Sequence, residues 1–197
     1  MKHSEKTTHF EEFYRQEVAA VYRFVYSRVH QHEDALEIVQ ESFLTFYQLQ
    51  QRAEAYEHER ALLFRLARNR AIDWLRRQRT RERVEHDATT TNVVPFRSTA
   101  PRTPEDLLLE KERQHYATTA LTSLSERDQE CLALRRSGLR YQEVAEVLQV
   151  NPNSVGQLIN RALRRFAETY DALLTGKLTG KSRITSDDEK AAQTRRK

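Results

Sequence analysis

Apolar residues recur at helical spacing along most of the chain. A first run extends from Phe10 to Val29, and a second begins at Asp34 and reads DALEIVQESFLTFYQLQQ, after a polar break at residues 30–32. Thr8 and Glu11 have the spacing of a capping box, which predicts that the first helix begins there. The polar segment Gln51–Glu59 predicts a loop. With only four Gly, four Pro and no hairpin signals between alternating strands, the pattern predicts an all-α protein.

A third helix is predicted from about Glu59 to Arg83. Residues 61–83 hold eight arginines and two acids, a net charge of +6. At 100° per residue, one side of this helix is apolar and the other polar. The apolar side comprises Phe64, Ala67, Ala71 and Leu75, and the opposite side comprises Leu62, Leu66, Asn69, Asp73 and Arg76. A solvated surface normally mixes both charge signs, so this arginine-rich face favours a polyanionic partner.

The second half contains a helix-turn-helix pattern. Residues 84–103 carry three consecutive threonines and two prolines, which predicts a flexible linker. Four helices follow, and the expected caps are Thr103, Ser125 and Asn151. Gln149-Val150-Asn151 forms a three-residue turn before a helix with an Asn/Gln/Arg face, which is typical of groove-reading helices. We therefore expect two small helical domains, residues 8–83 and 104–174, and a disordered tail over 175–197.

Charge and composition narrow the classes of function. Residues 1–60 hold seven basic and eleven acidic residues, a net charge of −4, which suggests a protein partner besides the polyanion. The single cysteine, Cys131, excludes an intrachain disulfide and a multi-cysteine zinc site. No Gly-rich phosphate loop, nucleophile–base pair or metal-ligand spacing is visible, so we expect no catalytic site, metal or cofactor. The sequence shows no signal peptide or membrane-spanning run, which predicts a cytoplasmic protein without membrane insertion.

Three segments, in order, resemble the bacterial sigma-70 family. DALEIVQESFLTFYQL (34–49) resembles the segment that binds core RNA polymerase. LFRLARNRAIDWLRR (63–77) resembles the promoter-melting helix, and residues 121–166 are similar to the C-terminal DNA-binding domain. The two-domain organisation is similar to the extracytoplasmic-function (ECF) subgroup. The resemblance implies a non-enzymatic initiation subunit that gives RNA polymerase its promoter choice, in an alternative or stress-type regulon.

The resemblance also implies three sets of functional residues. Those facing the clamp helices of core polymerase would be Asp34, Glu37, Gln40 and Glu41. Those holding the melted −10 strand would be Asn69, Arg70, Asp73, Arg76, Arg77 and Arg79. Those binding the −35 duplex would be Asn151, Asn153, Ser154, Gln157, Asn160, Arg161, Arg164 and Arg165. An anti-sigma factor held between the two domains is a further partner that relatives often have.

Four positions depart from the family pattern. Arg140 stands where a Ser or Thr cap is common, and Gln149 replaces the usual Gly of the turn. Leu158 replaces a basic residue, and Ser125 replaces a proline. We expect a looser helix start at residue 140 and, if the turn requires a positive φ, backbone strain of about 1 kcal/mol at Gln149. Two other hypotheses stay open, a helix-turn-helix regulator that binds duplex DNA without polymerase and, less favoured, an enzyme.

Overall fold

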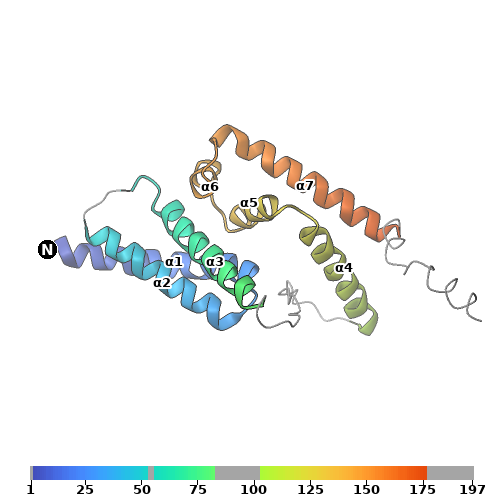
Figure 1. Ribbon diagram of the computed structural model, residues 1–197, viewed down its shortest axis with the longest axis horizontal. Coiled ribbons are helices and arrows are strands. Elements are labelled where there is room, and N and C mark those ends of the chain that lie inside the picture. The colour runs from blue at the N-terminus through green and yellow to red at the C-terminus, as the bar shows by residue number, and fades with distance from the viewer. Residues whose placement is uncertain (1, 53–55, 83–102, 177–197) are drawn as a thin grey trace, which may run out of the picture.

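The computed structural model describes residues 2–52, 56–82 and 103–176 (Figure 1). Over these residues the chain is all helical, as predicted, and contains no strand. The helices are α1 (Lys2–Val29), α2 (His32–Gln51), α3 (Glu59–Glu82), α4 (Pro104–Thr122), α5 (Glu126–Arg136), α6 (Tyr141–Leu148) and α7 (Pro152–Leu174). The expected linker, apart from Thr103, and the expected tail beyond Gly176 lie outside the described residues.

Helices α1, α2 and α3 form the first half of the molecule. Aromatic pairs hold them together: Phe13 stacks on Phe46 with ring centroids 4.9 Å apart, and Phe24 lies 5.4 Å from Phe64. The first helix begins at Lys2 and not at Thr8, and the second begins at His32 and not at Asp34. No glycine or proline precedes Thr8, so nothing local stops the helix from extending upstream of a capping-box spacing.

Helices α4 to α7 form the second half, and their ends follow the predicted caps. The Ser125 hydroxyl accepts a hydrogen bond from the Asp128 N–H at 3.2 Å, and Asn151 Oδ1 accepts one from the Asn153 N–H at 2.9 Å. Gly138 follows α5 with φ +88°. The start of α6 is stabilised although Arg140 stands where a Ser or Thr cap is common. The Glu143 carboxylate accepts a hydrogen bond from the Arg140 N–H at 2.5 Å.

Gln149 adopts the left-handed conformation that glycine usually supplies at this turn. Its φ and ψ are 53° and 51°, and its N–H is bonded to the carbonyl groups at the end of α6. The turn therefore keeps the geometry that glycine usually supplies, with a side chain that disfavours it.

The two halves share one hydrophobic core. Buried residues of α1, α2 and α3 form a continuous cluster with those of α5, α6 and α7. Besides α1 and α2, helix α3 contacts α6. Leu62 is therefore buried and Leu66 partly buried, although the helical period placed both on the polar side of α3. That prediction was wrong because a second layer covers this side of the first turns.

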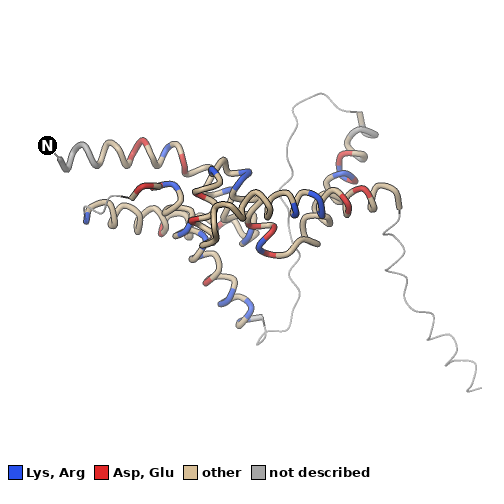
Figure 2. Tube along the Cα trace, turned by 90° about the horizontal axis from the view of Figure 1, so that it is seen from above, with Lys and Arg blue, Asp and Glu red and all other residues tan. Residues whose placement is uncertain are grey.

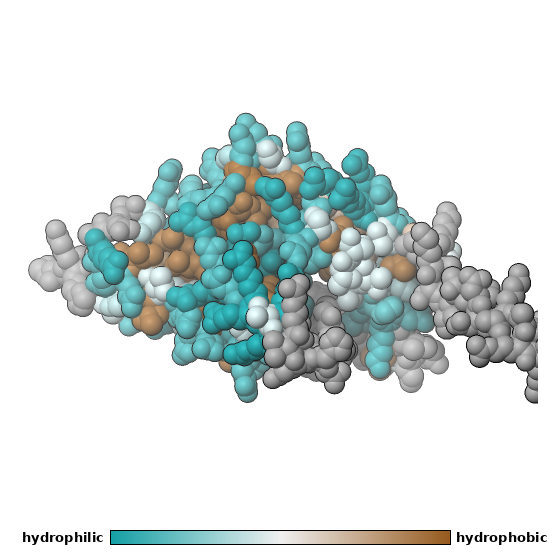
Figure 3. Space-filling view, in the orientation of Figure 1, coloured by the Kyte–Doolittle hydropathy of each residue, from teal (hydrophilic) through white to brown (hydrophobic). Residues whose placement is uncertain are grey.

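The charged residues are distributed unevenly over this framework. Basic residues gather toward the C-terminal end of α3, which projects away from the other helices (Figure 2). The surface seen in Figure 3 is mostly hydrophilic, with separate hydrophobic groups among the polar ones. The arginine-rich end of α3 is thus open to a partner, whereas its first turns belong to the core.

Candidate nucleic-acid and protein interfaces

The outer face of α2 is acidic, as the sequence predicted, but it is also apolar. Glu37, Gln40 and Glu41 are exposed and Asp34 is half-buried. Leu36 and Leu44 lie on the same side with 47% and 58% of their surface exposed. The sequence analysis missed these two leucines. The sequence contained the information needed to find them. Both lie four residues from Gln40 and outside the buried stripe of Ala35, Ile38, Val39, Ser42 and Phe46.

The exposed face of α3 contains most of the residues expected to hold a DNA strand. Asn69, Asp73, Arg76, Arg77 and Arg79 are exposed. Two arginines are tied to Asp73: Arg76 lies 3.9 Å from its carboxylate, and Arg77 Nε donates to its carbonyl at 3.3 Å. Arg79 instead pairs with Glu126 of α5 at 3.0 Å.

Arg70 joins the acidic face of α2 to the arginine face of α3. Its guanidinium forms an ion pair with Glu41 and donates to the Thr45 hydroxyl at 2.7 Å. Glu41 was expected to face polymerase and Arg70 to face DNA. The structure brings these two predicted sites together at one edge between α2 and α3.

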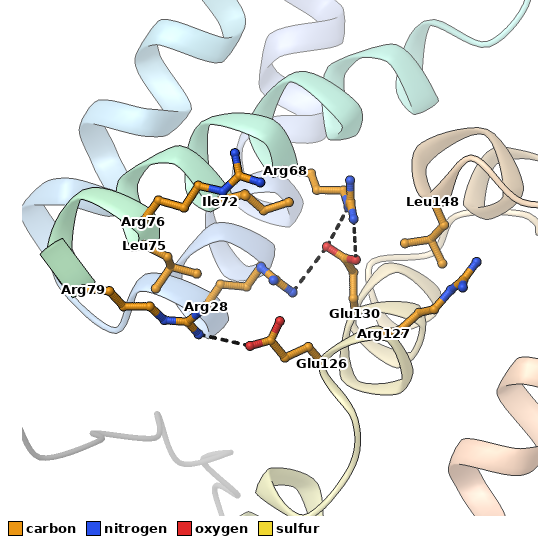
Figure 4. A pocket seen from close by; sticks show the side chains of 10 residues that line it. All are labelled: Arg28, Arg68, Ile72, Leu75, Arg76, Arg79, Glu126, Arg127, Glu130 and Leu148. Carbon is orange, nitrogen blue, oxygen red and sulfur yellow. Dashed lines mark hydrogen bonds and ion pairs between the residues drawn. The ribbon is translucent and has the colours of Figure 1, made fainter.

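Arginines of the first half also bind acceptors of the second half. Arg68 forms a bidentate pair with Glu130 at 2.8 and 3.0 Å, and Arg28 lies 3.3 Å from the same carboxylate (Figure 4). The Glu130 side chain is only 5% exposed. Arg79 pairs with Glu126 at 3.0 Å. These contacts hold α1 and α3 against α5.

Arg60 makes a further contact of this kind at the other end of α5. It donates to the carbonyl oxygens of Ser137 at 2.6 Å and Gly138 at 2.9 Å, and to Glu17 at 2.8 Å. Arg28, Arg60 and Arg68 were not among the residues predicted from the sequence. For Arg28 and Arg68 the available signal was Glu130, an acid next to Cys131 and four residues before Leu134, on the apolar side of its helix. A carboxylate at such a position needs a cation.

Helix α7 presents a polar row beside the turn. Asn153, Gln157, Asn160 and Arg164 are exposed, and Ser154 is half-buried. The Asn151 side chain caps the helix, as described above. Leu158, at the position where a basic residue is common, packs partly against the core.

Arg161 and Arg165 differ from the rest of this row because both bind a buried carboxylate. Arg161 donates to the Asp128 carboxylate at 2.6 Å, and Arg165 donates to the same carboxylate at 3.3 Å. The Asp128 side chain is 0% exposed. Burial alone would raise the pKa of Asp128. Hydrogen bonds from Arg161 and Ser125 and the charges of both arginines outweigh burial, so the pKa lies below its usual value. Sequence spacing could not show this pairing.

Cys131 is a buried thiol of α5. Burial raises the pKa of the Cys131 thiol to about 11, so the thiol is protonated at neutral pH and is a poor nucleophile. Among the described residues, no cluster of three or more His, Cys, Asp or Glu side chains could hold a metal ion. None of the helices described is long and apolar enough to cross a membrane.

Each half of the chain matches a known family model. The family model for Sigma-70 region 2 matches residues 13–81, and that for Sigma-70 region 4 matches residues 114–166. The chain is 30% identical over 163 residues to the ECF RNA polymerase sigma factor BldN of Streptomyces coelicolor, covering 80% of this chain. It spans 59% of the length of that curated relative.

A solved structure shares the fold. The sigma factor RpoE of Bartonella quintana, in complex with the anti-sigma factor NepR, superposes with a TM-score of 0.64 at 19% identity. The match covers 82% of this chain and 96% of the other. The first matched region coincides with α1 to α3, and the second begins within α4 and ends within α7.

Proposed function

Because the chain belongs to the sigma-70 family and to its ECF subgroup, we propose that it directs RNA polymerase to promoters and initiates transcription there. One observation carries this proposal: region 2 and region 4 match in their usual order, and each lies on one helical half. Such a subunit performs no chemistry of its own. It acts by binding RNA polymerase and promoter DNA, and the exposed residues of α2, α3 and α7 are suited to such binding.

The outer face of α2 is the surface that we propose for core polymerase. Asp34, Glu37, Gln40 and Glu41 supply carboxylates and an amide, and Leu36 and Leu44 add exposed apolar area to the same face. A docking surface with apolar residues inside a charged rim is typical of protein interfaces. The acidic rim favours a basic surface on the clamp helices of the polymerase.

The arginine face of α3 is proposed to hold the melted −10 strand. Arg76, Arg77 and Arg79 are exposed and project from the end of the helix, where guanidinium groups can clamp phosphates or stack on bases. Asn69 and Asp73 lie on the same face and can hydrogen-bond unstacked bases. Arg70 would join this set with the donors that its contacts to Glu41 and Thr45 leave free.

The polar row of α7 is proposed to read the −35 duplex. Asn153, Gln157, Asn160 and Arg164 are exposed, and these residue types form bidentate bonds with base edges in a major groove. Asn151 and Ser154 lie at the start of the same helix. Arg161 and Arg165 use one donor each on Asp128 and retain others for phosphate, because a guanidinium has five. An anti-sigma factor that binds both halves is a further proposed partner.

Run-off transcription tests the proposal. Core RNA polymerase is combined with a genomic promoter library, with and without this protein. We expect transcripts from a subset of promoters only when the protein is present. No stimulation at any promoter would overturn the proposal, and tight, specific duplex binding by the protein alone would favour a polymerase-independent regulator instead.

Two variants separate the proposed surfaces. Glu37→Lys reverses a charge on the α2 face and should weaken association with core polymerase by roughly tenfold or more, without altering the α7 row. Arg77→Ala removes an exposed cation from α3 and should slow open-complex formation while polymerase association stays unchanged. Association is measured by titration of labelled protein, and strand opening by permanganate reactivity. The same defect in both variants would contradict the assignment of polymerase association to α2 and of strand opening to α3.

A further inference from the structure

The cavity between the two halves has a composition that the proposed promoter contacts do not explain. It has a volume of about 580 Å³ and lies between α3 on one side and α5 on the other. It is lined by five arginines, two glutamates and three apolar side chains: Arg28, Arg68, Arg76, Arg79, Arg127, Glu126, Glu130, Ile72, Leu75 and Leu148. Its walls therefore carry a formal excess of three positive charges.

The two glutamates do not use all the donors of these arginines. Glu130 binds Arg28 and Arg68, and Glu126 binds Arg79. Arg76 is only 3.9 Å from Asp73 in an exposed pair, and Arg127 has no hydrogen bond or ion pair among the described residues. The Arg28 Nε is buried and finds no acceptor in the described part of the chain.

The arginines that line the cavity come from both halves of the molecule. In Figure 4, Arg76 and Arg79 extend from α3, Arg127 extends from α5 beside Leu148, and Arg28 and Arg68 point to Glu130 between them. Several guanidinium groups around one opening suit an anion with several phosphate oxygens, because each fork can bind two oxygens. The volume is also within the usual range for small-ligand sites.

We propose that this cavity binds a soluble oligophosphate anion that bridges α3 and α5. Such an anion would add contacts from both halves at once and stabilise their packing. It would also occupy Arg76 and Arg79, two residues proposed above to hold the −10 strand, so it would compete with promoter DNA. That competition rests on the proposed function, whereas the binding does not.

The test uses the full chain and inorganic tripolyphosphate in isothermal titration calorimetry at constant ionic strength. The informative variant is Arg127→Ala, since Arg127 lines the cavity and belongs to none of the proposed promoter or polymerase contacts. The matched control is Arg136→Ala, an exposed arginine of the same helix that is not among the lining residues. We expect saturable binding that Arg127→Ala weakens about tenfold and Arg136→Ala less than twofold.

A second arm distinguishes the two sources of phosphate. Single-stranded DNA replaces tripolyphosphate, and Arg127→Ala should leave its affinity within twofold of the unaltered protein. Absence of saturable tripolyphosphate binding would overturn the proposal, as would equal losses in the two variants. Equal losses of tripolyphosphate and DNA in Arg127→Ala would mean that the cavity holds a nucleic-acid strand, which also overturns it. Run-off transcription tests the promoter function separately.

Discussion

At the scale of single residues, Gln149 is strained at the turn between α6 and α7. The left-handed conformation costs a residue with a side chain about 1 kcal/mol or more, and glycine avoids this cost. Gln149→Gly should therefore raise the free energy of unfolding by about 0.5–1 kcal/mol, measured by urea unfolding. Gln142→Gly, the same change inside α6, should lower it by about 1 kcal/mol. A loss of stability in both variants would contradict the strain argument.

Asp128 is a buried carboxylate whose arginine partners hold its pKa below the usual value. Asp128→Asn keeps the shape but removes the charge that Arg161 and Arg165 require. We expect the free energy of unfolding at pH 7 to fall by about 2–4 kcal/mol. The half-exposed arginines can turn to water, which limits the loss.

The lowered pKa also predicts a dependence on pH. Ionised Asp128 stabilises the fold above the unfolded-state pKa of about 3.9, and this contribution disappears as the pH falls through the lower pKa of the folded state. Urea unfolding from pH 6 to pH 3 should therefore show a smaller acid-induced loss in Asp128→Asn than in the unaltered protein. Parallel profiles for the two proteins would exclude the linkage.

At the scale of elements, Asn151 has two assignments that can be separated. Its side chain caps α7, and it is also a candidate contact for the −35 duplex. Asn151→Ala should lower the free energy of unfolding by about 1 kcal/mol, whereas Asn151→Ser should preserve the cap. If Asn151 also touches bases, holoenzyme carrying the serine variant should bind the promoter more weakly at unchanged thermal stability. Equal promoter affinity at equal stability would restrict Asn151 to capping.

The helices of the second half were predictable because their ends are set locally. Ser125, Gly138, Asn151 and Pro152 each act within one turn of their own position, so short sequence patterns contain the required information. The start of α1 was not predictable in this way. A capping-box spacing fixes a helix start only when the chain upstream cannot remain helical.

The buried faces of α3 could be predicted only in part. Phe64, Ala67 and Ala71 are buried as the helical period indicated, because the period identifies the side that faces its neighbours in the first half. The burial of Leu62 depends on α6, more than 75 residues later in the sequence. For the same reason the spacing identified Arg161 and Arg165 as polar residues of α7 but not their partner on α5.

At the scale of the whole molecule, the proposed binding of both promoter elements conflicts with the packed arrangement of the two halves. Elements centred near −10 and −35 are about 25 base pairs apart, or about 85 Å along B-form DNA. In the structure, α3 and the second half are in direct contact through Arg68, Arg79 and the shared core. If both elements are bound as proposed, the two halves separate. Breaking the ion pairs between them then adds to the free energy that this separation requires.

The buried carboxylate of Glu130 should therefore control the packing of the halves. Glu130→Gln leaves Arg28 and Arg68 without a counterion and should reduce the free energy of unfolding by about 3 kcal/mol. The radius of gyration from small-angle X-ray scattering should increase. Glu126→Gln is the control, because the pair with Arg79 is 78% and 68% exposed and should contribute less than about 1 kcal/mol. An equally compact and stable Glu130→Gln protein would show that the apolar contacts alone hold the halves together.

The shared core has a consequence for protein engineering. Chimeras that combine one relative's region 2 with another's region 4 assume that the two modules are independent. In this chain Leu62, Arg60 and Arg68 are fitted to α5, α6 and the residues that follow α5. An exchange at residue 103 would preserve every helix yet mismatch these contacts. A recombinant with a new promoter preference should therefore also receive the donor's residues at positions 60, 62 and 68.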